Sequence, residues 1–239
     1  MVEFLSARDY GKKEVVIRVN DLDSPWGKND IKAIAALGPD AVLFPNIECR
    51  EDVIEAITEL DAAGGSNVAV MVMIESPLAV LNAKEIASAS DRIICMVLAT
   101  SDLISQMSAR VTNDRTALLT SLSLVILAAR AYGRGVIDCI HSKLNDTNAF
   151  EYACRLGRDM GFDGKSLVHP DQLPYANDAY TPKFSEIAHA EKVIKGLKEA
   201  NEAGRGTVVV NERLIEQHNV RAAEKLLMLR DAIKELENE

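Results

Sequence analysis

Short apolar runs rich in β-branched residues alternate along this sequence with longer segments of helical periodicity. This alternation restricts the fold to an α/β class, because strands that are apolar on both faces must be covered by helices. Turn residues such as Gly38-Pro39 and Gly64-Gly65 close the helical segments. The predicted strands are Val15–Asn20, Ala41–Pro45, Val68–Ile74, Arg92–Leu98, Val136–Ile140 and Ser166–His169.

Six βα units in series favour a TIM-type (β/α) barrel over a doubly wound sheet, although periodicity alone does not separate the two. No strand end carries a GxGxxG or P-loop pattern, so nothing indicates a nucleotide-binding sheet. The helices predicted between the strands are Asp30–Leu37, Glu51–Ala62, Pro77–Ser88, Asn113–Tyr132 and Thr147–Met160, with a further turn near Pro170.

The βα rhythm ends after Pro170. An amphipathic helix over Ser185–Ala203 and a charged helix over Asn219–Leu236 follow, with a small hairpin around Asn211-Glu212 between them. We therefore divide the chain into a (β/α) barrel part, residues 1–180, and a C-terminal helical extension with a hairpin, residues 181–239.

The net charge of −9, without any block of Lys and Arg, argues against nucleic acid or an anionic membrane as the main partner. The stretch Met1–Tyr10 has no apolar core of a secretory signal, and the most apolar stretch, Leu118–Ala129, is shorter than a bilayer span. The four cysteines show no C-x-x-C spacing. These features predict a reduced, cytoplasmic protein.

Two carboxylates follow consecutive predicted strands. Glu75 ends the third strand and Asp102 follows the fourth, and ligands of parallel βα folds gather at these carboxyl ends. Two protein carboxylates, completed by water and substrate oxygens, are a set that Mg²⁺ accepts. We expect both side chains to lie at one mouth of the sheet. The alternative is that each caps the helix that follows it.

Three further polar residues stand at predicted strand ends. Arg18 ends the first strand and could hold a substrate carboxylate through two parallel hydrogen bonds, or form a salt bridge with Glu48 after the second strand. His169, before Pro170, fits a packing or capping role as well as a catalytic one.

Several segments resemble the HpcH/HpaI aldolase and citrate lyase β-subunit family, in order and over essentially the whole chain. Among its members, the CoA-ester lyases, including malyl-CoA and citramalyl-CoA lyases, are the most similar. The segments are VIRVN at 16–20, LFPNIE at 43–48, MIESP at 73–77, VILAARA at 125–131, VID at 136–138, GFDGK at 161–165, HP at 169–170 and EAGRG at 202–206.

The resemblance implies a TIM-barrel lyase in which Glu75 and Asp102 hold Mg²⁺. Arg18 would bind the carboxylate of the α-keto acid half of a thioester substrate such as malyl-, citramalyl- or citryl-CoA. It would also act in catalysis, because with the metal it supplies fixed positive charge as the carbon–carbon bond breaks. Glu48 would be a further substrate-binding residue. In these relatives an acid from a neighbouring subunit's C-terminal extension protonates the thioester enolate, and Glu216 stands at that place here. A homo-oligomer built on trimeric contacts is therefore expected.

Four departures from the family pattern stand out. Asn46 replaces the usual Lys, and Ala99-Thr100-Ser101-Asp102 replaces Gly-x-Glu-Asp. Glu216-Gln217-His218 replaces an Asp followed by Pro, and the added methylene can displace the acid by about 1 Å and slow catalysis on the order of 100-fold. The family's first strand, first helix and acidic second strand have no counterpart, so a barrel without its first two strands is expected.

The sequence leaves three alternatives to a lyase. The first is a thioesterase on the same scaffold, in which water attacks the thioester. The second is a non-catalytic, truncated homologue that serves as a subunit or binding protein. Absence of Glu75 and Asp102 would favour this alternative, but both residues are present. The third is an aldolase that acts on small keto acids without a thioester.

Overall fold

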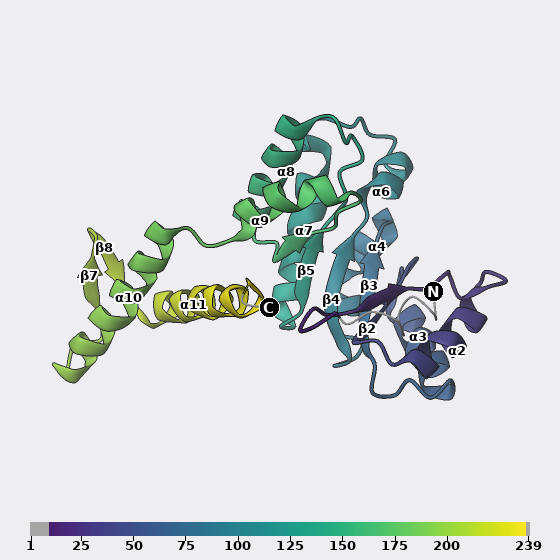
Figure 1. The fold of residues 1–239 in the computed structure, drawn as a ribbon, viewed down its shortest axis with the longest axis horizontal. Coiled ribbons are helices and arrows are strands. Elements are labelled where there is room, and N and C mark those ends of the chain that lie inside the picture. Colours follow the sequence, from purple (N-terminus) through teal and green to yellow (C-terminus); the bar gives the residue numbers. More distant parts are fainter. Residues whose placement is uncertain (1–9, 238–239) are drawn as a thin grey trace. The chain divides into compact units, whose positions relative to one another are not determined.

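The computed structural model describes residues 10–237, which form two compact units, one ending at Tyr180 and the other beginning at Thr181 (Figure 1). Each unit has its own hydrophobic core. The stretch before Tyr10, in which the sequence predicts no secretory signal, lies outside the described residues.

The first unit contains one parallel sheet whose strands lie side by side in chain order. A doubly wound sheet reverses its strand order at a switch point, whereas sequential order is that of a barrel. Within the described residues the first and last strands are not paired, so the sheet is a parallel half-barrel and a closed TIM barrel is not shown. The strands are β1 (Val16–Arg18), β2 (Ala41–Phe44), β3 (Ala69–Ile74), β4 (Ile93–Leu98), β5 (Gly135–Asp138) and β6 (Gly164–Lys165).

Helices connect consecutive strands, as a parallel sheet requires. No helix in residues 10–237 is long and apolar enough to cross a membrane. The helices of the first unit are α2 (Gly27–Leu37), α3 (Arg50–Ala62), α4 (Pro77–Leu81), α5 (Ala83–Ala87), α6 (Thr100–Gln106), α7 (Leu119–Ala131), α8 (Thr147–Met160) and α9 (Leu173–Tyr180), with 3₁₀ turns at Thr116–Leu118 and Pro170–Gln172.

Both faces of the central strands are apolar, which explains the continuous apolar runs in the sequence. Val70, Val72 and Ile74 pack with the helices in the main core. The intervening Met71 and Met73 face the other side, where a smaller cluster also contains Cys95. We call this second side the inner face.

The helix predicted over Pro77–Ser88 is two short helices that meet at Asn82. The Asn82 side chain donates a hydrogen bond of 2.9 Å to the Glu48 carbonyl, so it holds the segment after β2. Helix α6 was not predicted, because Thr100–Gln106 carries several polar residues and is only seven residues long.

The sixth strand lies at Gly164–Lys165, and the prediction of Ser166–His169 is wrong. The Ser166 backbone still donates to the Asp138 carbonyl, but the Val168 backbone donates to the Gln172 side chain at 3.0 Å and pairs with no strand. His169 caps the next 3₁₀ turn, where its Nδ1 accepts from the Asp171 backbone N–H at 3.2 Å.

The second unit consists of two helices and a hairpin: α10 (Phe184–Glu202), β7 (Val208–Val210), β8 (Arg213–Ile215) and α11 (Gln217–Glu237). Asn211 and Glu212 both have positive φ, of 50° and 63°, as a two-residue hairpin turn requires. Val193, Leu197, Ile215 and Val220 form the centre of its core.

Helix α5 supports the sheet through Ile86, which is fully buried, and α5 packs against α7. We expect Ile86→Ala to lower the free energy of unfolding by about 2–5 kcal/mol, because it removes apolar contacts and leaves a cavity. The neighbouring Leu81→Ala is the control, since Leu81 is 76% exposed and should change stability by less than about 0.5 kcal/mol. Urea unfolding followed by circular dichroism measures both, and equal losses would contradict this packing.

Candidate functional site

A cavity of about 170 Å³ lies beyond the carboxyl ends of β2 and β3, beside α6. Three carboxylates line it, and neither Lys nor Arg does. We call it the carboxylate cavity. Its lining residues are Asn46, Ile47, Glu48, Glu75, Ser76, Asp102, Ser105 and Gln106.

Glu75 reaches this cavity because it follows Met73 on the inner face, one residue past the end of β3. Ser76, and not Glu75, caps α4, since its hydroxyl accepts from the Ala79 backbone N–H at 3.0 Å. The Glu75 side chain is buried and its Oε1 accepts from the Asn46 backbone N–H at 2.6 Å. Glu75 is therefore fixed in position without being a helix cap.

Asp102 comes to the same cavity from the first turn of α6, where its side chain is exposed. Ala99 precedes this helix and offers no side-chain cap. The structure thus places the two carboxylates that follow consecutive strands on the wall of one cavity.

Asn46 organises this cavity, a role that the sequence analysis missed. Its backbone has a φ of 52°, in the left-handed region that Asn tolerates better than most residues. In this conformation its N–H points to Glu75, and its side-chain amide donates to the Asp21 carboxylate. The one feature of the sequence that could have pointed to this role is that Asn46 stands where the family usually has Lys.

Glu48 lines the carboxylate cavity, whereas Arg18 does not. Arg18 is exposed on the inner face of β1, where it lies opposite Leu43 in the register with β2. Arg18 and Glu48 both lie within the described residues and form no ion pair with each other. The salt bridge that was the alternative role of Arg18 is therefore not observed. Arg18 shares a face with Glu75 but lies two strands away.

Glu216 belongs to the second unit, between β8 and α11. Its backbone N–H donates to the Asn219 side chain at 2.8 Å, and its carboxylate lies 3.4 Å from Nδ1 of His218. The side chain is exposed.

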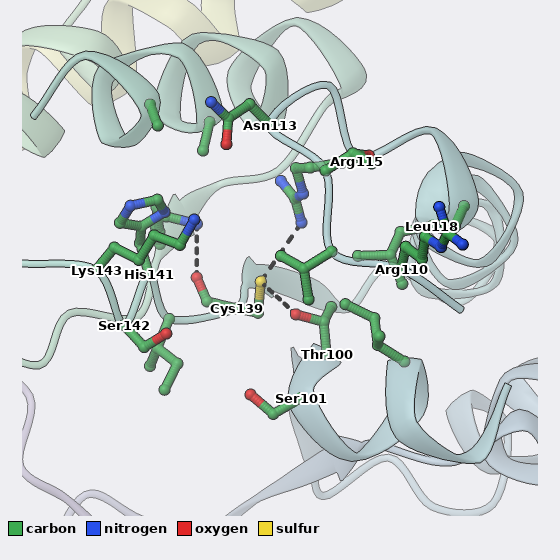
Figure 2. Close-up of a pocket in the computed structure, with 18 residues that line it drawn as sticks. Thr100, Ser101, Arg110, Asn113, Arg115, Leu118, Cys139, His141, Ser142 and Lys143 are labelled. Carbon is green, nitrogen blue, oxygen red and sulfur yellow. Dashed lines mark hydrogen bonds between the residues drawn. The ribbon is translucent and has the colours of Figure 1, made fainter. Parts of the chain in front are cut away.

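A second cavity, of about 250 Å³, opens on the other side of α6 (Figure 2). We call it the cationic pocket, because Arg110, Arg115, Lys143 and Lys165 line it and no Asp or Glu does. Local sequence patterns mark none of these four residues for binding.

Arg115 and Lys165 meet the buried carboxylate of Asp138, which ends β5. Arg115 holds both carboxylate oxygens, at 2.8 and 2.6 Å, and Lys165 donates to Oδ2 at 2.9 Å and to the Cys139 carbonyl at 2.6 Å. Burial alone would raise the pKa of Asp138, but the charges of Lys165 and Arg115 hold it below its usual range. Asp138 is therefore ionised.

Gly157 on α8 leaves the space that this cluster needs. A Cβ at this position would lie 3.0 Å from Oδ2 of Asp138 and 2.7 Å from the Tyr180 hydroxyl. Both distances are shorter than ordinary carbon–oxygen contacts, so a side chain here would displace the carboxylate or the phenol.

The donor set of the carboxylate cavity fits a hard divalent cation. The described residues contain no group of three or more His, Cys, Asp or Glu side chains arranged to hold a metal. Mg²⁺, however, is usually bound by one or two carboxylates with water and substrate oxygens as the remaining ligands. Glu75 and Asp102, in a cavity without a competing cation, meet that requirement.

The fold and these cavities define an α/β protein of barrel-type strand order with an acidic site at the carboxyl ends of its strands. The sequence profile of the HpcH/HpaI aldolase/citrate lyase family matches residues 1–170. The chain belongs to this family.

Two curated relatives and one solved structure show how close the match is. A (3S)-malyl-CoA thioesterase of Cereibacter sphaeroides is 38% identical over 229 residues, which cover 96% of this chain and 78% of the relative. The citrate lyase subunit beta of Leuconostoc mesenteroides is 36% identical over 236 residues, with the same coverage of each chain. The structure of CitE from Mycobacterium tuberculosis in complex with magnesium, acetoacetate and coenzyme A has a TM-score of 0.73, 25% identity, and covers 90% of this chain and 78% of its own.

The buried cluster gives a test of stability. We expect Asp138→Asn to lower the free energy of unfolding by about 3–5 kcal/mol, because two cations lose their buried partner. The lowered pKa of Asp138 stabilises the native protein at pH values above about 3.9, the ordinary pKa of Asp in an unfolded chain. This stabilisation is lost as the pH falls through the pKa that Asp138 has in the native protein. The variant should therefore lose less stability than the wild type between neutral and acid pH.

Urea unfolding at a series of pH values measures both effects. Glu151→Gln is the control, because its ion pair with Arg155 lies on the surface and should contribute little. If Asp138→Asn were as stable as this control, the Asp138 carboxylate would not be needed to compensate the charges of Arg115 and Lys165.

Proposed function

We propose that this chain is a Mg²⁺-dependent carbon–carbon lyase. Its substrate would be a small 3-hydroxyacyl-CoA dicarboxylate thioester, such as malyl-, citramalyl- or citryl-CoA, and its products acetyl-CoA or a similar thioester and an α-keto acid. The observation that carries this proposal is the carboxylate cavity, where Glu75 and Asp102 converge. Support comes from the family relation and from a family structure that contains magnesium, acetoacetate and coenzyme A.

The charge of the cavity explains why a cation is needed. Glu48, Glu75 and Asp102 would repel a substrate carboxylate, and no Lys or Arg lines the cavity to offset them. Glu75 and Asp102 would hold Mg²⁺, and the Asn46 N–H orients Glu75 for this role. When bound, the ion supplies fixed positive charge to the oxygens of the keto acid half.

Arg18 would bind the carboxylate of the keto acid half. Its guanidinium stands exposed on the inner face, and a planar fork suits a carboxylate better than an ammonium does. Glu48 would contact the same part of the substrate from the cavity wall.

Glu216 would protonate the thioester enolate carbon after the bond has broken. As in the relatives, we place this acid in the site of a neighbouring copy, so the protein would be a homo-oligomer with trimeric contacts. The exposed carboxylate on a separate unit supports this arrangement.

A thioesterase is the second candidate, because the 38%-identical relative is named (3S)-malyl-CoA thioesterase. In this reaction water would attack the thioester, and the products would be the free hydroxy acid (malate, citramalate or citrate) and CoA. A non-catalytic subunit and an aldolase that acts without a thioester are weaker candidates, since the carboxylates are in place and CoA recurs among the relatives.

The products decide between the two activities. The purified protein is incubated with malyl-, citramalyl- and citryl-CoA, with Mg²⁺ or with EDTA, and acetyl-CoA, keto acid and free CoA are followed by mass spectrometry. We expect Mg²⁺-dependent release of equal amounts of acetyl-CoA and keto acid. Free CoA with an intact hydroxy acid would instead establish the thioesterase, and no turnover of any of the three would contradict both.

Glu75→Gln and Asp102→Asn should each abolish this turnover and weaken Mn²⁺ binding, followed by electron paramagnetic resonance, by at least about tenfold. Both amides keep the size of the side chain but remove the charge. Glu51→Gln, an exposed position in the first turn of α3, is the matched control. Unchanged Mn²⁺ affinity in both variants would rule out the metal site.

Mixing two inactive variants tests the role of Glu216. We expect Glu75→Gln and Glu216→Gln to be inactive alone, and their mixture to recover part of the activity, because some sites then combine an intact Glu75 with an intact Glu216 from another copy. Light scattering before and after mixing checks that an oligomer is present. A monomer, or a mixture that stays inactive while subunits exchange, would contradict a shared site.

A further inference from the structure

The cationic pocket concentrates positive charge in a chain whose net charge is −9. Arg110 and Lys143 are exposed at this pocket, and Arg115 and Lys165 are buried in it. Of these, only the buried pair has a carboxylate partner among the described residues, and they share that partner, Asp138. Two buried cations against one carboxylate leave an excess positive charge next to the pocket.

The buried cations also keep hydrogen-bonding capacity. Arg115 uses N–H groups on Asp138 and on the Cys139 sulfur, and Lys165 uses two on Asp138 and the Cys139 carbonyl. A guanidinium has five N–H groups and an ammonium three, so each has donors beyond these bonds. Figure 2 shows Arg115 directed toward the Cys139 sulfur at the base of the pocket.

The ring of His141 contributes a further polar atom, Nε2, to this region. Its Nε2 atom is buried and meets no hydrogen-bond partner in the described part of the chain, although His141 lines the pocket. A buried ring nitrogen without a partner is unfavourable, and a hydrogen bond to a bound ligand would remove that cost. Burial and the nearby Lys165 lower the pKa of His141, which keeps the ring neutral.

Apolar side chains complete the lining, with Ile104, Val111 and Ile140 among them. A ligand that fits must therefore carry negative charge and also an apolar or amide-containing chain. Four cations suit a group with more than one negative charge, such as a phosphate, better than a single carboxylate.

Helix α6 separates this pocket from the carboxylate cavity. Thr100, Ser101 and Ile104 line the cationic pocket, while Asp102 and Ser105 line the carboxylate cavity. The two cavities thus lie on different sides of one helix, whose diameter with side chains is about 10 Å. A pantetheine chain is longer than this, so one thioester can reach both.

We propose that the cationic pocket binds the phosphate-bearing end of the substrate's pantetheine arm, while the acyl group lies in the carboxylate cavity. This inference rests on the proposed function and adds the site that recognises the carrier of the acyl group. The phosphate can come from coenzyme A or from phosphopantetheine attached to a carrier protein, and both present the same group to Arg110, Lys143, Arg115 and Lys165.

The test is a binding measurement that needs no turnover. Isothermal titration calorimetry in EDTA compares CoA, 4′-phosphopantetheine and pantetheine with the wild type and with the double variant Arg110→Ala/Lys143→Ala. These two side chains are exposed, so their removal should leave the fold intact, as circular dichroism will check. Lys32→Ala/Lys84→Ala makes the same change in charge at exposed positions outside both cavities and serves as the control.

We expect wild-type protein to bind CoA at least about tenfold more tightly than pantetheine, with an affinity that falls as salt rises. The double variant should lose this difference, and the control should keep it. Equal affinity for CoA and 4′-phosphopantetheine means that the phosphate next to pantetheine suffices, so that either carrier is accepted. Tighter binding of CoA means that the nucleotide phosphates contribute and that free CoA is the carrier.

Two results would overturn the inference. The first is that the double variant binds CoA with unchanged affinity. The second is that the double variant loses binding of oxaloacetate or pyruvate instead of CoA, which would assign the pocket to the keto acid. These outcomes are independent of the lyase proposal, because CoA binding can persist in a protein that cleaves none of the three thioesters, and cleavage can persist without this pocket.

Discussion

The carboxylate of Asp138 is buried at the end of β5, where a charge without partners would be strongly unfavourable. Arg115 and Lys165 compensate it, and they come from the loop before α7 and from β6. Strand β6 has only two residues, and the ion pair adds a side-chain contact between Lys165 on β6 and Asp138 at the end of β5. Arg115 lies in a turn with a left-handed backbone conformation, with a φ of 56°, and its backbone N–H donates to the Thr112 carbonyl. The base of the cationic pocket therefore depends on one carboxylate.

Much of the sheet follows from local sequence. Strands β2, β3 and β4 lie close to their predicted positions because they are buried on both faces, which leaves apolar runs too short for helices. The shared cavity of Glu75 and Asp102 follows from the same reasoning, since parallel strands all end at one edge. Arg18 could be assigned to a strand but not to a cavity, because side-chain reach across a curved sheet depends on its curvature and register.

The cationic pocket could not be predicted in this way. Its cations come from the loop after α6, the turn before α7, the segment after β5 and β6, and no spacing relates them. Only tertiary packing brings them together. The error at β6 has a similar origin: Leu167 and Val168 have the composition of a strand, but Leu167 packs with α8 and α9 and the Gln172 side chain takes the Val168 N–H. The packing of Leu167 and the nearby Gln172 side chain overrode the strand preference.

The hydrogen bond from Asn46 to Glu75 also bears on the discrimination between metal ions. The Asn46 N–H takes one lone pair of Glu75 Oε1 and so holds the carboxylate in one orientation. Ca²⁺ commonly takes a carboxylate through both oxygens in a flexible site with six to eight ligands, whereas Mg²⁺ requires a compact octahedron with single-oxygen contacts. A Glu75 carboxylate held in one orientation by this backbone amide would therefore suit the compact ligand shell of Mg²⁺ better than the larger and more flexible shell of Ca²⁺.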